Sequence, residues 1–279
     1  MDFSLPQGMD RLPHHRGRLI AACQAGTNEP DVIGMAIAGS FVEGTPDIYS
    51  DLDLRVVLAN GSLERIFPRR EEFAGECGPL VAAFTGEHVG EPQLLITLYD
   101  DLMHVDYLFI ELADAPRKND FRKVQVLWQR DPHVSEALSR PYVADPAADL
   151  AYMEARIWTW TWYIQSKILR GELWEAVSGL AFVRTAVLFR LLAMSQKIRF
   201  RGARFAEQTV GEYSGAVART LGSLENESLL EALRTTVSLY VELADPLLEQ
   251  YGVEPAPAAR QTVLSALEAG LSWRPSNLL

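Results

Sequence analysis

Hydrophobic and polar residues alternate in short runs over about the first 115 residues, and turn-forming residues separate the runs. Short runs rich in β-branched and aromatic side chains predict strands. Such runs lie at 32–38, 51–58, 93–99 and 104–111. Segments between them with helical spacing lie at about 13–25, 39–42 and 63–83. This alternation of helices and strands predicts an α/β domain with a mixed sheet.

The pattern changes after about residue 130. Prolines at 132, 141 and 146 disfavour a continuous helix and predict a linker. Beyond it the hydrophobic positions recur with helical spacing, and the predicted helices lie at 150–170, 172–198, 228–251 and 257–273, with a further one near 210–221. We therefore predict an α/β domain at residues 1–130, followed by an all-α helical bundle at 131–279.

Composition is typical of a globular protein, with 48% hydrophobic and 23% charged residues among 279. The formal net charge is −11, so the chain lacks the basic surplus that duplex-binding proteins use to replace counterions. This argues against duplex nucleic acid as a partner. A single nucleotide remains compatible with the charge through a local basic pocket and bridging metal ions, and a cationic small substrate suits an acidic chain.

Neither secretion nor membrane insertion is indicated. The two cysteines, Cys23 and Cys77, show no metal-binding spacing, and the N-terminus lacks the apolar run of a signal peptide. The longest apolar stretch, 177–194, contains Arg184 and Arg190, which would be costly inside a bilayer. We expect this stretch to be a buried helix whose arginines pair with acids of the bundle, and we expect the protein in the cytoplasm.

Gly39 and Ser40 follow the apolar strand at 32–38 and would open a short helix. Free backbone N–H groups at a helix start favour phosphate. Gly39 would let the backbone approach a ligand closely, and the Ser40 hydroxyl could cap the helix or touch a phosphate oxygen.

Asp51 and Asp53 begin the next strand. Because strand side chains alternate, both carboxylates project from one face, while Leu52 and Leu54 project from the other. Two adjacent carboxylates repel each other, and a divalent cation between them removes that repulsion. Magnesium prefers such oxygen ligands and keeps positions for water and phosphates.

Asp106 supplies a third carboxylate on the strand at 104–111, where it shares a face with His104 and Leu108. If this strand lies beside the strand of Asp51, the three acids converge at one edge of the sheet. Three carboxylates can hold two Mg²⁺ ions for a displacement at phosphorus, and Asp106 could accept a proton from an attacking hydroxyl.

Each feature taken alone has an ordinary structural explanation. Gly39 and Ser40 could form a plain turn, Asp51 and Asp53 a solvated strand edge, and Asp106 a surface position on a half-exposed strand. Their order along the chain, bounded by strands, favours the metal site.

These residues resemble the nucleotidyltransferase superfamily that includes DNA polymerase beta. Its signature is a hydrophobic strand, Gly-Ser, about ten residues, Asp-hydrophobic-Asp, and a third acid on a later strand. The matching residues are Gly39, Ser40, Asp51, Asp53 and Asp106. The resemblance implies an enzyme that needs magnesium and transfers a nucleoside monophosphate, with ATP or another NTP as co-substrate. Pyrophosphate leaves, and the three aspartates serve as catalytic and metal-binding residues.

The helical half looks like that of the members that modify aminoglycoside or lincosamide antibiotics. In those proteins a lysine on the first long helix points at the nucleotide phosphates, which implies Lys167 here. Many relatives carry a basic residue soon after Gly-Ser, whereas this chain has Phe41, Val42 and Glu43. Another basic group would then contact the triphosphate, either Lys167 or the stretch 197–204.

The resemblance implies an antibiotic-resistance function, with the helical domain binding the acceptor and completing the cleft. It also leaves open a homodimer that shares its active sites. The sequence is also compatible with two alternatives: transfer to a protein or RNA acceptor, as in toxin-neutralising members, or a catalytically inactive nucleotide-binding module.

Overall fold

The structure is a computed structural model that describes residues 2–118, 123–139 and 145–273. It contains two compact units, Met1–Val143 and Ala144–Leu279. Each unit has its own hydrophobic core. Part of the predicted linker, 140–144, lies outside the described residues.

The first unit is built on a six-stranded sheet with the order β3-β4-β5-β2-β1-β6. The strands are β1 (Val32–Ile37), β2 (Leu52–Leu58), β3 (Leu80–Gly86), β4 (Glu91–Tyr99), β5 (His104–Glu111) and β6 (Gln125–Gln129). Strands β2 and β5 run parallel, and the other neighbouring pairs run antiparallel. The predicted mixed sheet is confirmed.

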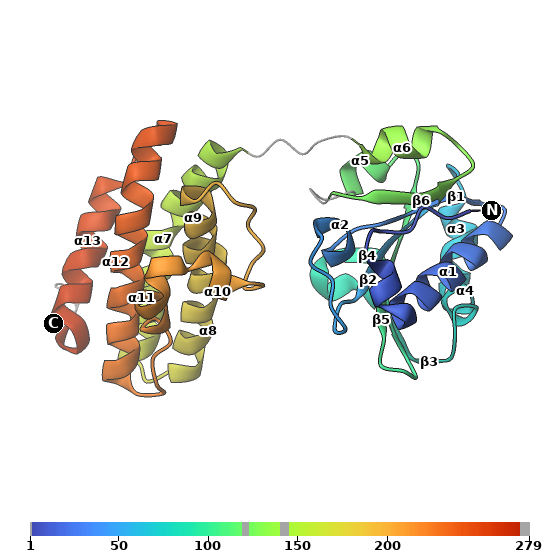
Figure 1. Ribbon diagram of the computed structural model, residues 1–279. Helices are drawn as coiled ribbons and strands as arrows, with labels where there is room; N and C mark the ends of the chain where they lie inside the picture. Colours follow the sequence, from blue (N-terminus) through green and yellow to red (C-terminus); the bar gives the residue numbers. More distant parts are fainter. Residues whose placement is uncertain (1, 119–122, 140–144, 274–279) are drawn as a thin grey trace. The chain divides into compact units, whose positions relative to one another are not determined.

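Strand β2 is buried along its whole length because helices cover both faces of the sheet. Leu52, Leu54 and Val56 pack on one face with residues of α1 and α4, and Val57 packs on the other with residues of α5 and α6. Figure 1 shows α5 and α6 on the other side of the sheet from α1 and α4. The helical elements of this unit are η1 (Met9–Arg11), α1 (Pro13–Asn28), α2 (Ser40–Glu43), α3 (Leu63–Ile66), η2 (Phe67–Arg69), α4 (Arg70–Gly75), η3 (Glu87–Val89), α5 (Ala115–Lys118) and α6 (His133–Leu138). Helix α6 lies in the stretch where the prolines predict a linker, and it packs near β6.

One predicted element of this unit is wrong, and one strand has no counterpart among the predictions. The helix predicted at 63–83 is broken after Gly75, and its last part is β3, which pairs with β4. Gly78 has a φ of 143°, which is incompatible with an α-helix. The residues that follow form backbone hydrogen bonds with β4 instead. Strand β6 was not predicted, because its short apolar run gains its partners only from β1.

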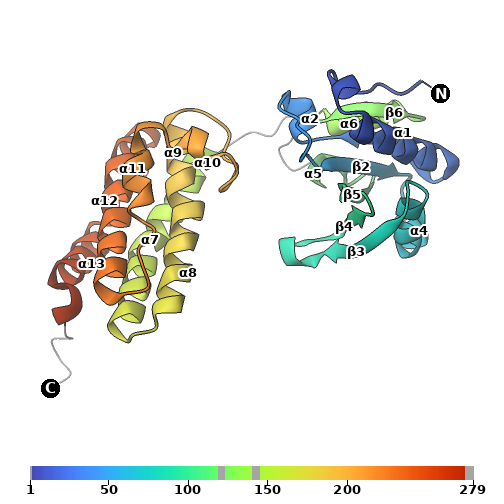
Figure 2. The same cartoon turned by 60° about the horizontal axis from the view of Figure 1, so that its bottom comes forward.

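The second unit is a helical bundle, as predicted. Its long helices are α7 (Pro146–Leu169), α8 (Leu173–Val183), α9 (Phe189–Ser195), α12 (Asn226–Tyr251) and α13 (Pro257–Ala269). Its shorter elements are a π-helical turn η4 (Arg184–Leu188), α10 (Ala206–Thr209), η5 (Gly211–Tyr213), α11 (Ser214–Ala218) and η6 (Gly270–Ser272). Helices α7, α8 and α12 pack against one another (Figure 2).

The segment Leu173–Ser195 is long and apolar enough to span a membrane by length and composition. In the structure it is a core helix whose Val183, Val187 and Leu191 are buried in the bundle. Arg190 forms the expected ion pair, with Nη1 2.7 Å from Asp149 Oδ1. The expectation is wrong for Arg184, whose Nη1 donates to the Thr220 carbonyl oxygen at 3.0 Å.

Candidate metal and nucleotide site

The sheet brings the three aspartates together. Asp53 and Asp106 are directly paired positions on the parallel strands β2 and β5, and Asp51 lies two residues before Asp53. One carboxylate oxygen from each residue lies within 4.8 Å of the others. Alternation along the two strands explains this convergence, since the neighbouring Leu52, Leu54 and Val105 belong to the core on the opposite face. The structure therefore forms the cluster that the sequence predicts.

The cluster is partly withdrawn from water. Asp53 is 5% exposed, and the Asp106 side chain is 18% exposed. His104 Nε2 lies 3.1 Å from Asp106 Oδ1. This pairing, reinforced by the charges of Asp51 and Asp53, raises the pKa of His104 above its ordinary value despite the opposing effect of burial. The three aspartates therefore favour the positively charged form of His104.

Asp106 Oδ1 is buried and has no hydrogen-bond partner among the described residues. His104 Nε2, 3.1 Å away, forms an ion pair with this oxygen when the imidazole is protonated. A buried carboxylate oxygen without a hydrogen bond is costly unless a cation binds it. Three carboxylates of this kind fit Mg²⁺, which prefers hard oxygen ligands and needs few of them from the protein.

Gly39 lies against the cluster. Its backbone has a φ of 71° and a ψ of −152°, a region that only glycine adopts readily. A Cβ at this position would stand 2.1 Å from Asp53 Oδ2. The pairing of Ala38 N with Asp53 O at 2.8 Å holds the turn next to the aspartate. This position therefore requires glycine for two reasons: its backbone conformation and the absence of a side chain next to Asp53.

Ser40 is the first residue of α2, and Gly39 occupies the N-cap position. The Ser40 side chain makes no capping hydrogen bond, so the capping alternative is wrong. Its Oγ is buried without a hydrogen-bond partner in the described part of the chain. The Ser40 hydroxyl can therefore still donate and accept hydrogen bonds, and it lies next to the turn at Gly39.

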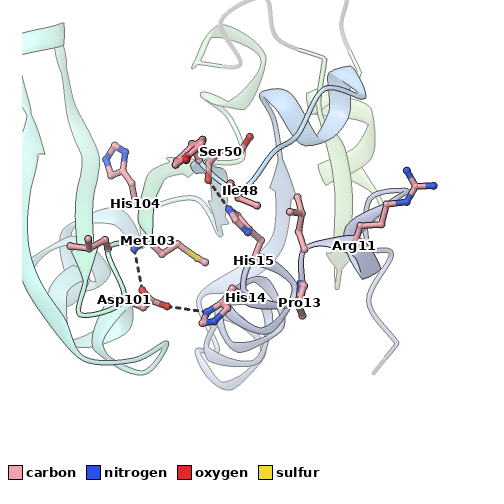
Figure 3. A pocket seen from close by; sticks show the side chains of 12 residues that line it. Arg11, Pro13, His14, His15, Ile48, Ser50, Asp101, Met103 and His104 are labelled. Atoms are coloured by element: carbon pink, nitrogen blue, oxygen red, sulfur yellow. Dashed lines mark hydrogen bonds and ion pairs between the residues drawn. The ribbon is translucent and has the colours of Figure 1, made fainter.

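His15 also belongs to this region, although no sequence pattern points to it. Its side chain is 5% exposed, and its Nε2 lies 2.8 Å from the carbonyl oxygen of Ser50, directly before Asp51. Its ring also packs 5.5 Å from the ring of Phe41 in α2. Helix α1 thereby holds the segment that leads into Asp51 (Figure 3). No motif or spacing signals a contact across 35 positions of the chain.

A pocket of about 500 Å³ lies in the first unit, and none of the three aspartates is among its described lining residues (Figure 3). Its wall includes Ser50, which precedes Asp51, and His104, which contacts Asp106. The other lining residues come from the start of α1, from the segment before β2 and from the turn between β4 and β5.

Lys167 lies near the end of α7 in the second unit. Its Nζ is 2.7 Å from Glu172 Oε2, and this pairing raises the pKa of Lys167. The ammonium group also lies 4.9 Å from the centre of the Tyr163 ring. In the basic stretch at 197–204, Arg201 and Arg204 lie over the ring of Phe205. A phosphate contact by either group remains a prediction.

Several solved structures are similar to this chain, and three of them are described here. One is an aminoglycoside 6-adenyltransferase from Bacillus subtilis, with a TM-score of 0.43 and 14% identity, covering 92% of this chain and 99% of that chain. A nucleotidyltransferase-like protein from Exiguobacterium sibiricum has a TM-score of 0.40 and 13% identity, covering 91% and 87%. A STING-associated c-di-GMP synthase from Capnocytophaga granulosa has a TM-score of 0.29 and 12% identity, covering 82% and 80%. No protein-family model and no curated protein matches the chain.

Proposed function

We propose that this protein is a magnesium-dependent nucleotidyltransferase that transfers a nucleoside monophosphate, AMP from ATP, to a hydroxyl of a small acceptor and releases pyrophosphate. The observation that supports this most is the convergence of Asp51, Asp53 and Asp106, whose carboxylate oxygens lie within 4.8 Å of one another. A pure binding module has no need for three converging acids that repel one another.

The three aspartates are the proposed ligands of two Mg²⁺ ions. When bound, such ions stabilise charge on the attacking and leaving oxygens of a displacement at phosphorus. Asp106, with its partly buried carboxylate, is the proposed acceptor of the proton from the attacking hydroxyl. His104, beside it, would stabilise negative charge on Asp106 until that proton arrives.

The turn at Gly39 and Ser40 is the proposed site of the triphosphate. Gly39 allows the backbone to lie directly against Asp53, so phosphate and metal ligands come from adjacent positions. The buried Ser40 hydroxyl, which lacks a hydrogen-bond partner among the described residues, would donate to a phosphate oxygen. Lys167 or the basic stretch at 197–204 would supply positive charge toward the triphosphate.

The proposed acceptor is an aminoglycoside or lincosamide antibiotic, so that the reaction inactivates the drug. The helical unit would contribute to acceptor binding, and the proposed location is the cytoplasm. A homodimer is compatible with this scheme.

Pyrophosphate release from ATP and Mg²⁺ tests the proposal across a panel of aminoglycosides and lincosamides. We expect acceptor-dependent release by the native protein and a loss of at least about a thousandfold in Asp53→Asn, because Asn keeps the shape but not the charge. Asp47→Asn is a matched control, since Asp47 is an exposed acid of the segment before β2. Native protein that binds ATP but releases no pyrophosphate with any acceptor would contradict the antibiotic assignment.

A further inference from the structure

The face of the sheet that carries the aspartates continues as an apolar surface across two further strands. The strand register pairs Asp106 of β5 with Ile96 of β4, and Ile96 in turn with Phe84 of β3. A neighbouring row pairs His104 with Leu98. Directly paired residues of neighbouring strands project from the same face of a sheet. Ile96, Leu98 and Phe84 therefore form an apolar platform beside the carboxylate cluster.

The helices of the first unit leave this platform open in the described part of the chain. Helices α5 and α6 cover the adjoining part of the same face, where Leu94 and Leu108 pack with them. The platform residues belong to none of the hydrophobic clusters that the described residues form. Phe84 is 52% exposed, and Ile96 and Leu98 are half-buried. Exposed apolar side chains gathered on one face mark a binding surface, whereas single exposed residues do not.

The platform offers an uncharged and partly aromatic surface. Its outermost residue, Phe84, lies on the edge strand β3, and its ring centre is 5.8 Å from the ring centre of His88. Glu87 is the nearest acid along the chain, and the Thr85 hydroxyl donates a hydrogen bond to its carboxylate. An uncharged ring gains free energy by leaving water for such a surface, whereas a charged group would lose its hydration without a partner. The platform therefore suits an uncharged ring.

The order of the strands puts the platform across the cluster from the turn at Gly39. Strand β2, which carries Asp53, lies between β1 and β5, and β4 and β3 lie beyond β5. Gly39 follows β1 and lies against Asp53. In a displacement at phosphorus the attacking and leaving oxygens lie on opposite sides of the phosphorus. Because the proposed reaction has the triphosphate at Gly39 and the acceptor hydroxyl at Asp106, the acceptor would extend away from β1, over β4 and β3.

The register also sets the size of the acceptor. Neighbouring strands lie about 4.8 Å apart, so Asp106 and Phe84, two strands apart in one row, are separated by about 10 Å. We propose that the platform binds the acceptor, and that the acceptor carries an uncharged ring about 10 Å from the hydroxyl that receives the nucleotide. The ring would pack on Phe84 and the intervening atoms on Ile96. This inference rests on the proposed function.

A minimal probe tests the inference without turnover. The alcohol 6-phenylhexan-1-ol separates its hydroxyl from its ring by about this distance, and benzyl alcohol is too short. Methyl NMR of the full chain, with labelled isoleucine and leucine, records the binding of each alcohol in the presence of Mg²⁺ and a non-hydrolysable ATP analogue. The variants are Phe84→Ser and Phe84→Tyr. Val81→Ser is the matched control, since Val81 is 58% exposed on the same strand but lies where the register with β4 shifts.

We expect the longer alcohol to shift the methyl signals of Ile96 and Leu98. Phe84→Ser should weaken its binding about tenfold, because the probe loses its aromatic contact, while Phe84→Tyr and Val81→Ser bind it as the native protein does. The binding of benzyl alcohol should not respond to Phe84→Ser. With Mn²⁺ in place of Mg²⁺, the paramagnetic ion should relax the protons beside the hydroxyl of the longer alcohol more strongly than its ring protons.

No binding of the longer alcohol, binding that is indifferent to Phe84→Ser, or stronger relaxation of the ring protons would overturn the inference. Weaker binding of the ATP analogue in Phe84→Ser would also overturn it, because the platform would then serve the nucleotide. So would a native dimer that dissociates in Phe84→Ser, because the platform would then join two copies of the chain. Failure of the proposed function would instead appear as pyrophosphate release that Asp53→Asn leaves unchanged, whatever the alcohols do.

Discussion

At the scale of single residues, Gly39 combines a backbone requirement with a steric one. Its φ and ψ lie in a region that side chains exclude, and a Cβ would enter the space of the Asp53 carboxylate. Gly44, five residues later, also has a positive φ of 79° but has no atom within 4 Å of a built Cβ. An alanine at Gly44 would therefore only strain the backbone, whereas an alanine at Gly39 would also displace the Asp53 carboxylate.

We expect Gly39→Ala to reduce nucleotidyl transfer at least about a hundredfold, because a displacement of about 1 Å at a catalytic group has that effect. Gly44→Ala should keep near-native transfer while it loses about 1 kcal/mol of stability. Transfer rates are measured below the melting temperature of both variants. Equal activity in the two variants would show that Gly39 serves only the turn.

The carboxylate cluster was predictable because alternation within a strand fixes which side chains share a face. Asp51, Asp53 and Asp106 follow from that rule once β2 and β5 are neighbours. His15 was not predictable, because its contact with Ser50 depends on how α1 packs across the sheet. The unmet hydrogen bonding of Ser40 Oγ likewise appears only in three dimensions.

At the scale of elements, a buried glutamate joins three parts of the helical bundle. Glu154 of α7 is 3% exposed and accepts hydrogen bonds from Trp158 Nε1 and Ala256 N, each at 2.9 Å, and from the Tyr240 hydroxyl of α12. Removing the acceptor would leave two buried donors and one partly buried donor without this partner.

We expect Glu154→Ala to lower the free energy of unfolding by about 3 kcal/mol, since it removes a buried and fully bonded group. Glu249→Ala, at an exposed position of α12, should change it by less than about 0.5 kcal/mol. Urea unfolding followed by the tryptophan signal measures both. A Glu154→Ala variant as stable as the control would contradict the role of this network.

Helix α1 buries Cys23, and Cys77 is buried just after α4. Burial, with a smaller effect of Cys77, raises the pKa of Cys23 from its ordinary value of 9.0 to about 12. Burial also raises the pKa of Cys77. The folded state therefore keeps the Cys23 proton where the unfolded chain loses it, so this contribution to stability is present below pH 9.0 and is lost as pH rises toward about 12.

Both thiols should accordingly resist an aromatic disulfide reagent at pH 8.5 in the native protein and react fully in urea. The rate of native labelling should rise only with conditions that unfold the first unit. Labelling of native protein at the rate of a free thiol would contradict the burial of these cysteines.

The long elements were predictable from periodicity, and β3 and β6 were not. Strand β3 contains Ala82 and Ala83, which are compatible with a helix, and only its pairing with β4 determines its conformation. Strand β6 is short, and its partner β1 lies about ninety positions earlier in the chain. Local propensity cannot reveal such partners.

At the scale of the whole molecule, each unit contains its own core. The largest cluster of buried residues lies wholly within the helical unit, and two other clusters lie wholly within the sheet unit. Units with separate cores commonly fold alone. We expect a fragment of residues 145–279 to give a helical circular dichroism spectrum and a cooperative thermal transition. A fragment that stays unfolded would show that its core depends on the sheet unit.

The central claim is that Asp51, Asp53 and Asp106 support the transfer of a nucleoside monophosphate. The most direct measurement follows label from ATP marked at its α-phosphate into the acceptor, with and without Mg²⁺, in the native protein and in Asp53→Asn. We expect a labelled acceptor only with native protein and Mg²⁺, with pyrophosphate released in equal amount. Label that enters the acceptor equally well with Asp53→Asn, or no label in any acceptor from native protein that binds ATP, would contradict it.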